Sequence, residues 1–229
     1  MKFTISRAAF IEALQLVVNV IERKQTLPIL SHVLVVAAEQ TISLTATDQE
    51  VEVKMTVSGA ETDLSISGEG QIAVPGRKLL DICKNLPPDS QIAVNTSDNR
   101  FTLSSGEFES QLATLSAMDF PNLEHEQERL ESIELSTGKL KSMLEKTSFA
   151  MAQQDVRYFF NGMLFEIQGV VLRLVATNGQ RLAITETSIE EVASGVRAIV
   201  PRKGITELQR LISDSTSEIE VWFTSNHMV

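Results

Sequence analysis

Residues 44–50 read Leu-Thr-Ala-Thr-Asp-Gln-Glu, and residues 174–180 read Leu-Val-Ala-Thr-Asn-Gly-Gln. These two segments align at an offset of 130 residues. A second pair, Val74-Pro75-Gly76-Arg77-Lys78 and Val200-Pro201-Arg202-Lys203-Gly204, aligns at an offset of 126. Because the order of apolar and polar residues around these segments also matches, the chain is predicted to hold two copies of one folding unit.

Each copy predicts two helices laid on an antiparallel sheet. A short strand, Phe3 to Ile5 or Ile133 to Leu135, is followed by a serine, Ser6 or Ser136, that is suited to cap a helix. Apolar residues then recur at helical spacing, and alternating runs such as residues 51–57 predict strands with one apolar face. A second helix is expected after each Val-Pro pair, where proline suits the first turn. The predicted fold class is α+β, with tandem repeats of this unit.

The predicted domains are residues 1–121 for the first repeat, 122–131 for a linker and 132–229 for the second repeat. The region from 119 to 128 is polar, acidic and contains proline, which is typical of a connector. The second copy has no counterpart to residues 101–115 of the first, where further strands are expected. A sheet without those strands exposes unpaired backbone groups, so we expect the natural polypeptide to be longer.

The second helix of each copy is predicted to be amphipathic. In the second copy the expected apolar stripe is Ile205, Leu208 and Leu211, and the expected solvent face is Lys203, Glu207 and Arg210. In the first copy Leu79, Ile82 and Leu86 face inward and Arg77, Asp81 and Lys84 face outward. Both second helices are thus predicted to present basic groups to solvent.

The formal net charge of -10 is unevenly distributed. The four predicted helices with their entry loops carry twelve Lys and Arg against five Asp and Glu, a net +7, which leaves -17 for the rest. These segments are residues 6–24, 76–86, 137–149 and 201–211. A basic helical layer predicts phosphate contact with a duplex, and the alternative is an ordinary solvated face with intrahelical ion pairs. Since Phe10 and Phe149 are expected in the core, stacking on single-stranded bases is not expected.

Neither catalysis nor a cofactor is predicted. The three histidines, His32, His125 and His227, lack metal-ligand spacing to one another or to Cys83, and no Walker A motif is present. Cys83 is expected to be a buried structural thiol. Residues 68–73, Gly-Glu-Gly-Gln-Ile-Ala, match G-x-G-x-x-A, but strand-like residues follow, so we interpret them as a hairpin turn.

A cytoplasmic protein without membrane contact is expected. No stretch of the chain reaches the roughly 20 consecutive apolar residues that a spanning helix needs. The run from Phe10 to Ile21 is broken by polar residues and is not followed by a cleavage pattern, which argues against a signal peptide. The single cysteine fits a reducing compartment.

Several segments spread over the whole chain are characteristic when they are taken together. They are Met1-Lys2-Phe3-Thr4, Thr26-Leu27-Pro28-Ile29-Leu30, Val74-Pro75 with Arg77-Lys78, Asp119-Phe120-Pro121-Asn122-Leu123, Gln154-Asp155-Val156-Arg157-Tyr158, Asn161-Gly162-Met163-Leu164-Phe165-Glu166 and Ile199-Val200-Pro201-Arg202-Lys203. In these segments and their order the chain resembles the bacterial β sliding clamp family, the processivity subunits of the replicative DNA polymerase. The resemblance covers the N-terminal two of the family's three units. It implies a non-catalytic protein whose full-length form is a homodimeric ring around duplex DNA, with helices lining the inside.

The resemblance also implies the site residues. The implied DNA-binding residues are Lys24, Arg77, Gln154, Arg202 and Lys203. Lys24 stands where the family has arginine, so a charge remains but a bidentate fork is lost. A ring interface with the third unit is implied at Lys78 and Ile82.

A pocket for short peptides from replicative polymerase, clamp loader and repair proteins is implied at Phe160, Thr177, Gly179, Gln180, Arg181 and Leu182. Asn178-Gly179-Gln180-Arg181 departs from the family's Asp-Gly-His-Arg, which leaves partner preference open. An alternative is that Phe160 and Leu182 are ordinary core residues. For the whole chain, the alternative function is a repeat-built protein-interaction scaffold without a DNA role.

Overall fold

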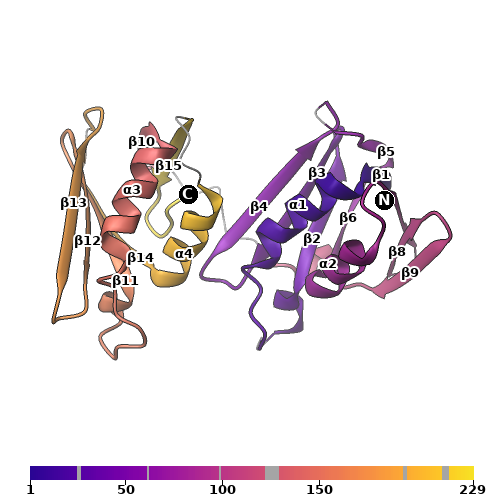
Figure 1. Ribbon diagram of the computed structural model, residues 1–229, viewed down its shortest axis with the longest axis horizontal. Helices are drawn as coiled ribbons and strands as arrows, with labels where there is room; N and C mark the ends of the chain where they lie inside the picture. Colours follow the sequence, from indigo (N-terminus) through magenta and orange to yellow (C-terminus); the bar gives the residue numbers. More distant parts are fainter. Residues whose placement is uncertain (25–26, 61, 98, 122–128, 193–194, 213–216) are drawn as a thin grey trace. The chain divides into compact units, whose positions relative to one another are not determined.

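The computed structural model describes residues 1–24, 27–60, 62–97, 99–121, 129–192, 195–212 and 217–229. The chain forms two compact units, Met1–Leu123 and Glu124–Val229 (Figure 1). Residues 122–128 of the predicted linker, His125 among them, lie outside the described residues. Among the described helices, none is long and apolar enough to cross a membrane.

The first unit holds two antiparallel sheets and two helices. Its elements are β1 (Lys2–Ser6), α1 (Arg7–Val18), η1 (Pro28–Ser31), β2 (His32–Ala38), β3 (Thr41–Thr47), β4 (Glu52–Ser58), β5 (Ser65–Gly68), β6 (Gly70–Pro75), α2 (Gly76–Asn85), β7 (Gln91–Ser97), β8 (Arg100–Ser105), β9 (Phe108–Ala113) and η2 (Ala117–Asp119). The strand orders are β4-β3-β2-β6 and β5-β1-β7-β8-β9. Helix α1 packs on β3 and β4, α2 packs on β2 and β6, and the two helices contact each other.

The second unit repeats this arrangement. Its elements are β10 (Glu131–Ser136), α3 (Thr137–Ser148), η3 (Tyr158–Asn161), β11 (Gly162–Gln168), β12 (Val171–Thr177), β13 (Leu182–Ser188), β14 (Val196–Pro201), α4 (Arg202–Leu211) and β15 (Glu218–Phe223). The order β13-β12-β11-β14 reproduces β4-β3-β2-β6, and β10 pairs with β15 as β1 pairs with β7. Helix α3 packs on β12 and β13, and α4 packs on β11 and β14. The predicted repeat of two helices on antiparallel sheet is confirmed.

Both predicted serine caps are present. The Ser6 hydroxyl accepts a hydrogen bond from the Ala9 amide at 3.4 Å, and the Ser136 hydroxyl accepts one from the Lys139 amide at 3.3 Å. Each serine has extended backbone geometry, which ends the preceding strand and starts the helix at the next residue. The same short sequence signal therefore sets the strand-to-helix turn in both units.

The interpretation of residues 68–73 as a hairpin turn is wrong. Strand β5 pairs with β1, whereas β6 pairs with β2 in the other sheet of the unit. The chain therefore crosses from one sheet to the other at Gly68 to Gly70. Gly70 has a φ of 154°, a backbone conformation that residues other than glycine rarely adopt.

Three side chains in or directly after the helices differ from their predicted environments. Phe149 follows the last residue of α3 and is 57% exposed, so it is not in the core. Leu211 is exposed because α4 ends there, and Ile212, in extended geometry, is buried in its place. Glu207 is buried instead of solvated, and its carboxylate accepts a hydrogen bond from Arg210 Nη1 at 2.6 Å.

Cys83 is a buried thiol, as predicted. Its side chain is fully buried in the core of the first unit, and it forms no disulfide. Burial raises the pKa of the thiol to about 12, because the charged thiolate is poorly solvated there. Such a thiol is neither a nucleophile nor a metal ligand at neutral pH.

Candidate nucleic-acid interface and peptide pocket

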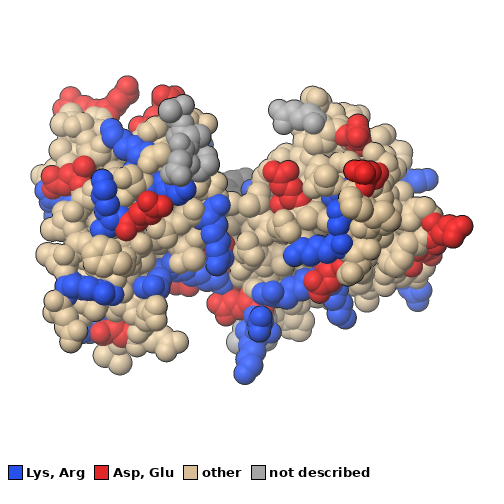
Figure 2. Space-filling view, viewed as in Figure 1, with Lys and Arg blue, Asp and Glu red and all other residues tan. Residues whose placement is uncertain are grey.

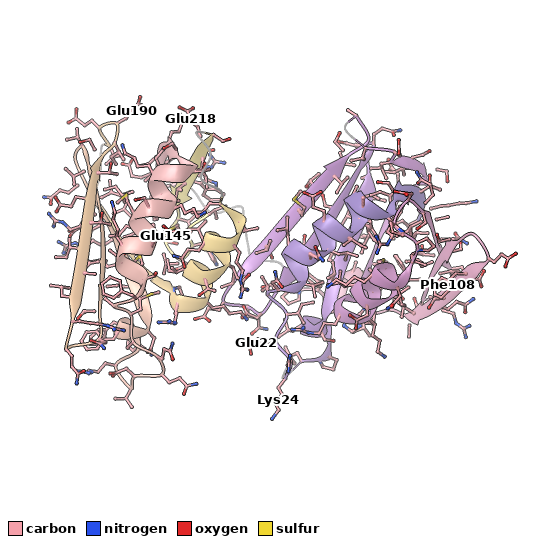
Figure 3. The ribbon with its side chains drawn as sticks, in the orientation of Figure 1. Glu22, Lys24, Phe108, Glu145, Glu190 and Glu218 are labelled. Carbon is pink, nitrogen blue, oxygen red and sulfur yellow. The ribbon has the colours of Figure 1, made fainter. Side chains whose placement is uncertain are left out.

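The loops after α1 and α3 place two predicted DNA-binding residues at equivalent positions. Lys24 and Gln154 are 130 residues apart, which is the repeat offset, and both side chains are exposed. Figure 3 shows Lys24 extending from its loop away from the strands and helices of the first unit. Gln154 has a φ of 56°, an uncommon conformation for a residue other than glycine.

Hydrogen bonds stabilise the left-handed turn at Gln154. The amide of Asp155 donates to Asn161 Oδ1 at 2.9 Å, and Asn161 Nδ2 donates back to the Asp155 carbonyl at 2.8 Å. The loop after α3 is thereby bonded to the last residue of η3, directly before β11. This pairing holds Gln154 in place although its backbone conformation is unfavourable by itself.

The two predicted DNA-binding arginines contact main-chain carbonyls. Arg77, in the first turn of α2, donates from Nη2 to the carbonyl of Ile21. Arg202, in the first turn of α4, donates from Nη1 to the carbonyls of Met151 and Ala152 at 3.3 and 3.4 Å. Lys203 is half-buried beside Arg202. Both guanidiniums therefore lie at the bases of the loops that carry Lys24 and Gln154.

Basic side chains lie on and next to the helices of each unit. Figure 2 shows Lys and Arg spread over the side of each unit that carries its helices, with a few carboxylates between them. Lys84 on α2 and Lys146 on α3 are exposed. Such a surface attracts phosphate groups without reading base sequence.

A cavity of about 610 Å³ in the second unit joins residues that were predicted for two different ligands. Its walls are Met151, Ala152, Gln153, Gln154, Asp155, Arg157, Asn178, Gly179, Gln180, Arg181 and Arg202. Gly179, Gln180 and Arg181 belong to the predicted peptide pocket, whereas Gln154 and Arg202 belong to the predicted DNA contacts. The loop after α3 is therefore one wall of a cavity whose other wall is the β12–β13 turn.

The β12–β13 turn keeps the geometry of its counterpart in the first unit. Asn178 Oδ1 accepts from the amides of Gln180 and Arg181, both at 3.0 Å. In the first unit Asp48 Oδ1 accepts from the amides of Glu50 and Val51 at 3.0 and 2.8 Å. Because an amide oxygen replaces a carboxylate oxygen in the same two bonds, asparagine at 178 preserves the turn.

The predicted peptide-pocket residues lie around this turn. Thr177 Oγ1 accepts from the Gly179 amide at 3.0 Å and donates to the Arg181 carbonyl at 2.7 Å. Leu182 is 61% exposed at the start of the edge strand β13, which excludes it from the core. Phe160 is half-buried and lies close to Gly179, where an added Cβ would be 3.4 Å from its ring.

Arg157 is a site residue that the sequence reasoning missed. Its guanidinium lies 4.4 Å from the centre of the Phe160 ring and forms two hydrogen bonds of 3.0 Å with the Asp155 carboxylate. These side-chain bonds, together with one from the Arg157 amide, lower the pKa of Asp155 to about 2. Only the Asp-x-Arg spacing next to aromatic residues could have indicated this pair from sequence.

The two residues predicted at a ring interface share one face of α2. Lys78 and Ile82 are four positions apart, so their side chains lie one above the other on the helix. Lys78 is exposed and Ile82 is half-buried against the core.

Among the described residues, no group of three or more His, Cys, Asp or Glu side chains could hold a metal ion.

Comparisons with known proteins agree over the whole chain. Residues 1–124 match the family described as DNA polymerase III beta subunit, N-terminal domain, and residues 134–229 match its central domain. The beta sliding clamp of Pseudomonas putida is 44% identical over 229 residues, and that of Escherichia coli K12 is 40% identical over 228 residues. The crystal structure of the DNA polymerase III subunit beta from Pseudomonas aeruginosa gives a TM-score of 0.93 at 43% identity.

The matched relatives are longer than this chain. All of the chain is covered in each of these three comparisons, but it covers only 61% of each relative. The chain thus spans about three fifths of their length.

Proposed function

The chain belongs to the family of the DNA polymerase III beta subunit, the bacterial β sliding clamps, and on that premise we propose that it acts as a DNA sliding clamp. In this proposal the protein is non-catalytic. It encircles duplex DNA, docks short peptides of partner proteins and confers processivity on the replicative DNA polymerase. Its site of action is the bacterial cytoplasm, at the nucleoid.

The observation that carries the proposal is the repeated placement of basic helices and equivalent exposed loops in both units. Lys24 and Gln154 extend from the same loop of the repeat, and the helices together with the loop after α1 hold twelve of the chain's 20 Lys and Arg residues although the chain is acidic. A positive helical layer attracts phosphates, and acidic sheets discourage DNA from binding elsewhere. Because such contacts position a duplex without specifying its sequence, they allow sliding.

The proposal assigns the residues as follows. Lys24, Gln154 and Lys203 contact the duplex, and Arg77 and Arg202 belong to the same DNA-binding set. Phe160, Thr177, Gly179, Gln180, Arg181 and Leu182 receive peptides from polymerase, clamp loader and repair proteins. Lys78 and Ile82 contribute to the ring interface of a full-length homodimer built from three units per chain. Residues 1–121 and 132–229 are its first two units, joined by residues 122–131.

Retention on circular and linearised DNA tests this function. The protein encoded by the intact gene is sedimented to establish its oligomeric state and is then loaded on both forms of the same plasmid. A topological clamp stays on the circle and is lost through the ends of the linear form. A monomer that shows no difference between the two forms because it is retained on neither would instead support a protein-interaction scaffold without a DNA role.

A further inference from the structure

Arg77 contacts the first unit at the point where its DNA-binding loop begins. Helix α1 ends at Val18, and the amides of Val20 and Ile21 still donate to the carbonyls of Val17 and Val18 at 3.2 and 3.1 Å. The Ile21 carbonyl then accepts from Arg77 Nη2, three residues before Lys24. The guanidinium therefore bonds to the tight turn that follows α1, directly before the loop.

Arg202 makes the corresponding contact in the second unit. Met151 occupies the position of Ile21 at the repeat offset of 130, and its carbonyl accepts from Arg202 Nη1 at 3.3 Å. The amides of Ala150 and Met151 donate to Thr147 and Ser148 at 3.0 and 3.2 Å, as the turn after α1 does. Gln154 follows Met151 by three residues, as Lys24 follows Ile21.

The two arginines are not at equivalent positions of the repeat. Arg202 aligns with Gly76, and Arg77 aligns with Lys203. At Gly76 a Cβ would lie 2.7 Å from Ile21 Cδ1 and 2.7 Å from Val33 Cγ2, so a side chain fits there only if these groups shift. In the first unit the guanidinium comes from the next residue instead. Both units therefore contain a bond from a guanidinium to the carbonyl at the equivalent position, Ile21 or Met151. The arginine that makes it stands at a different position of the second helix in each unit.

The chemistry of a helix end explains why a guanidinium suits this place. Ile21 and Met151 close the tight turns that follow α1 and α3, and their carbonyls resemble the last carbonyls of a helix, which have no intrahelical partner and carry partial negative charge. Arginine has five N–H donors, so it can satisfy such a carbonyl and still keep its positive charge. A guanidinium bonded in this way fixes the turn from which the loop departs.

We propose that Arg77 and Arg202 are positioning residues, which hold the helix-end turns below Lys24 and Gln154 and act on DNA through those loops. This inference rests on the proposed function, because it assumes that the loops meet a duplex. Under this inference each arginine affects DNA binding through the position of its loop and not through a phosphate contact of its own.

Amide hydrogen exchange tests the positioning role without DNA. In the Arg77→Gln variant, exchange at the Val20 and Ile21 amides should rise roughly tenfold because the turn opens locally more often. The Ala150 and Met151 amides of the second unit should keep their rates, and Arg202→Gln should give the reverse pattern. Arg100→Gln, which removes an exposed guanidinium bonded to Gln111 on the sheet, is the matched control. Unchanged exchange at Val20 and Ile21 in Arg77→Gln would overturn the proposal.

A double-mutant cycle on duplex affinity separates positioning from direct contact. Arg77→Gln should weaken duplex binding roughly threefold in the unmodified chain and have almost no effect when Lys24 is already alanine. Equal losses in both backgrounds would mean that Arg77 contacts phosphate independently of Lys24, which contradicts the proposal. These affinities are measured on the protein encoded by the intact gene. If that protein without substitutions binds no duplex, the proposed function fails, and the exchange experiment alone decides whether the guanidiniums hold the turns.

Discussion

At the residue scale, the pair of Asp155 and Arg157 links the loop after α3 to Phe160 of the proposed peptide pocket. The carboxylate of Asp155 bonds the guanidinium of Arg157, and that guanidinium covers the ring of Phe160. Asn161 bonds both the amide and the carbonyl of Asp155. We therefore expect a change at Asp155 to displace both Gln154 and Phe160.

The pKa of Asp155 predicts when this linkage is lost. Its folded value is about 2, below the ordinary 3.8, so the ionised carboxylate stabilises the second unit fully above about pH 4. This contribution is lost as the pH falls from about 4 to about 2. A carboxyl titration followed by NMR should show a midpoint near 2. A midpoint near 3.8 would mean that the pair with Arg157 does not persist in solution.

The thiol of Cys83 should be unreactive while the first unit is folded. Its pKa is raised to about 12 and its side chain is fully buried, so thiolate and reagent access are both lacking. Ellman's reagent at pH 8 should therefore modify the thiol only after denaturant unfolds the unit. Modification of the native protein within minutes would show that the core around Cys83 opens far more readily than its packing indicates.

At the scale of single elements, the two serine caps offer matched substitutions in separate units. Replacing Ser6 or Ser136 by alanine removes the acceptor for one orphan amide and should cost about 1 kcal/mol of stability in that unit. Thermal or denaturant unfolding measures the loss. Ser97→Ala, an exposed serine at the end of β7, is the control and should change stability by less than about 0.5 kcal/mol. Equal effects of all three changes would show that the caps contribute nothing specific.

Local patterns predicted the elements well but not their long-range pairing. The caps at Ser6 and Ser136 and the alternation of residues 51–57 are signals within a few residues, and the structure contains the corresponding helices and strand. The crossing at Gly68 to Gly70 was missed because β5 selects β1, more than sixty residues away, over its neighbour β6. In sequence, two glycines between two strand-like runs look the same whether the two strands pair in a hairpin or belong to different sheets.

Side chains at helix ends and in the site were predicted less well for the same reason. Periodicity places Leu211 inside only if α4 continues, but the helix stops and Ile212 turns inward. The carbonyl contacts of Arg77 and Arg202 join residues about fifty positions apart, which no spacing rule indicates. Lys24 and Gln154 were assigned from the family resemblance, and the repeat offset of 130 places them on equivalent loops.

At the scale of the whole molecule, the division of charge is more informative than the total. A chain of net charge -10 should repel DNA if its charges were evenly mixed, yet its helices and their entry loops are net positive. The same fold in both units places these helices on the sheets β4-β3-β2-β6 and β13-β12-β11-β14 in the same way. Binding should therefore depend on which basic residues are present and not only on how many.

Two double variants of equal charge distinguish these possibilities. Lys84→Gln with Lys146→Gln removes two exposed charges from the helices, and Lys2→Gln with Lys54→Gln removes two exposed charges from the strands. Each phosphate contact that is lost should lower the slope of log affinity against log salt by roughly 0.9. Duplex affinity measured over a salt series should show a reduced slope for the helix variant and an unchanged slope for the strand variant. Equal reductions in both would mean that DNA responds to the overall charge of the protein and that the helical layer has no special part in binding.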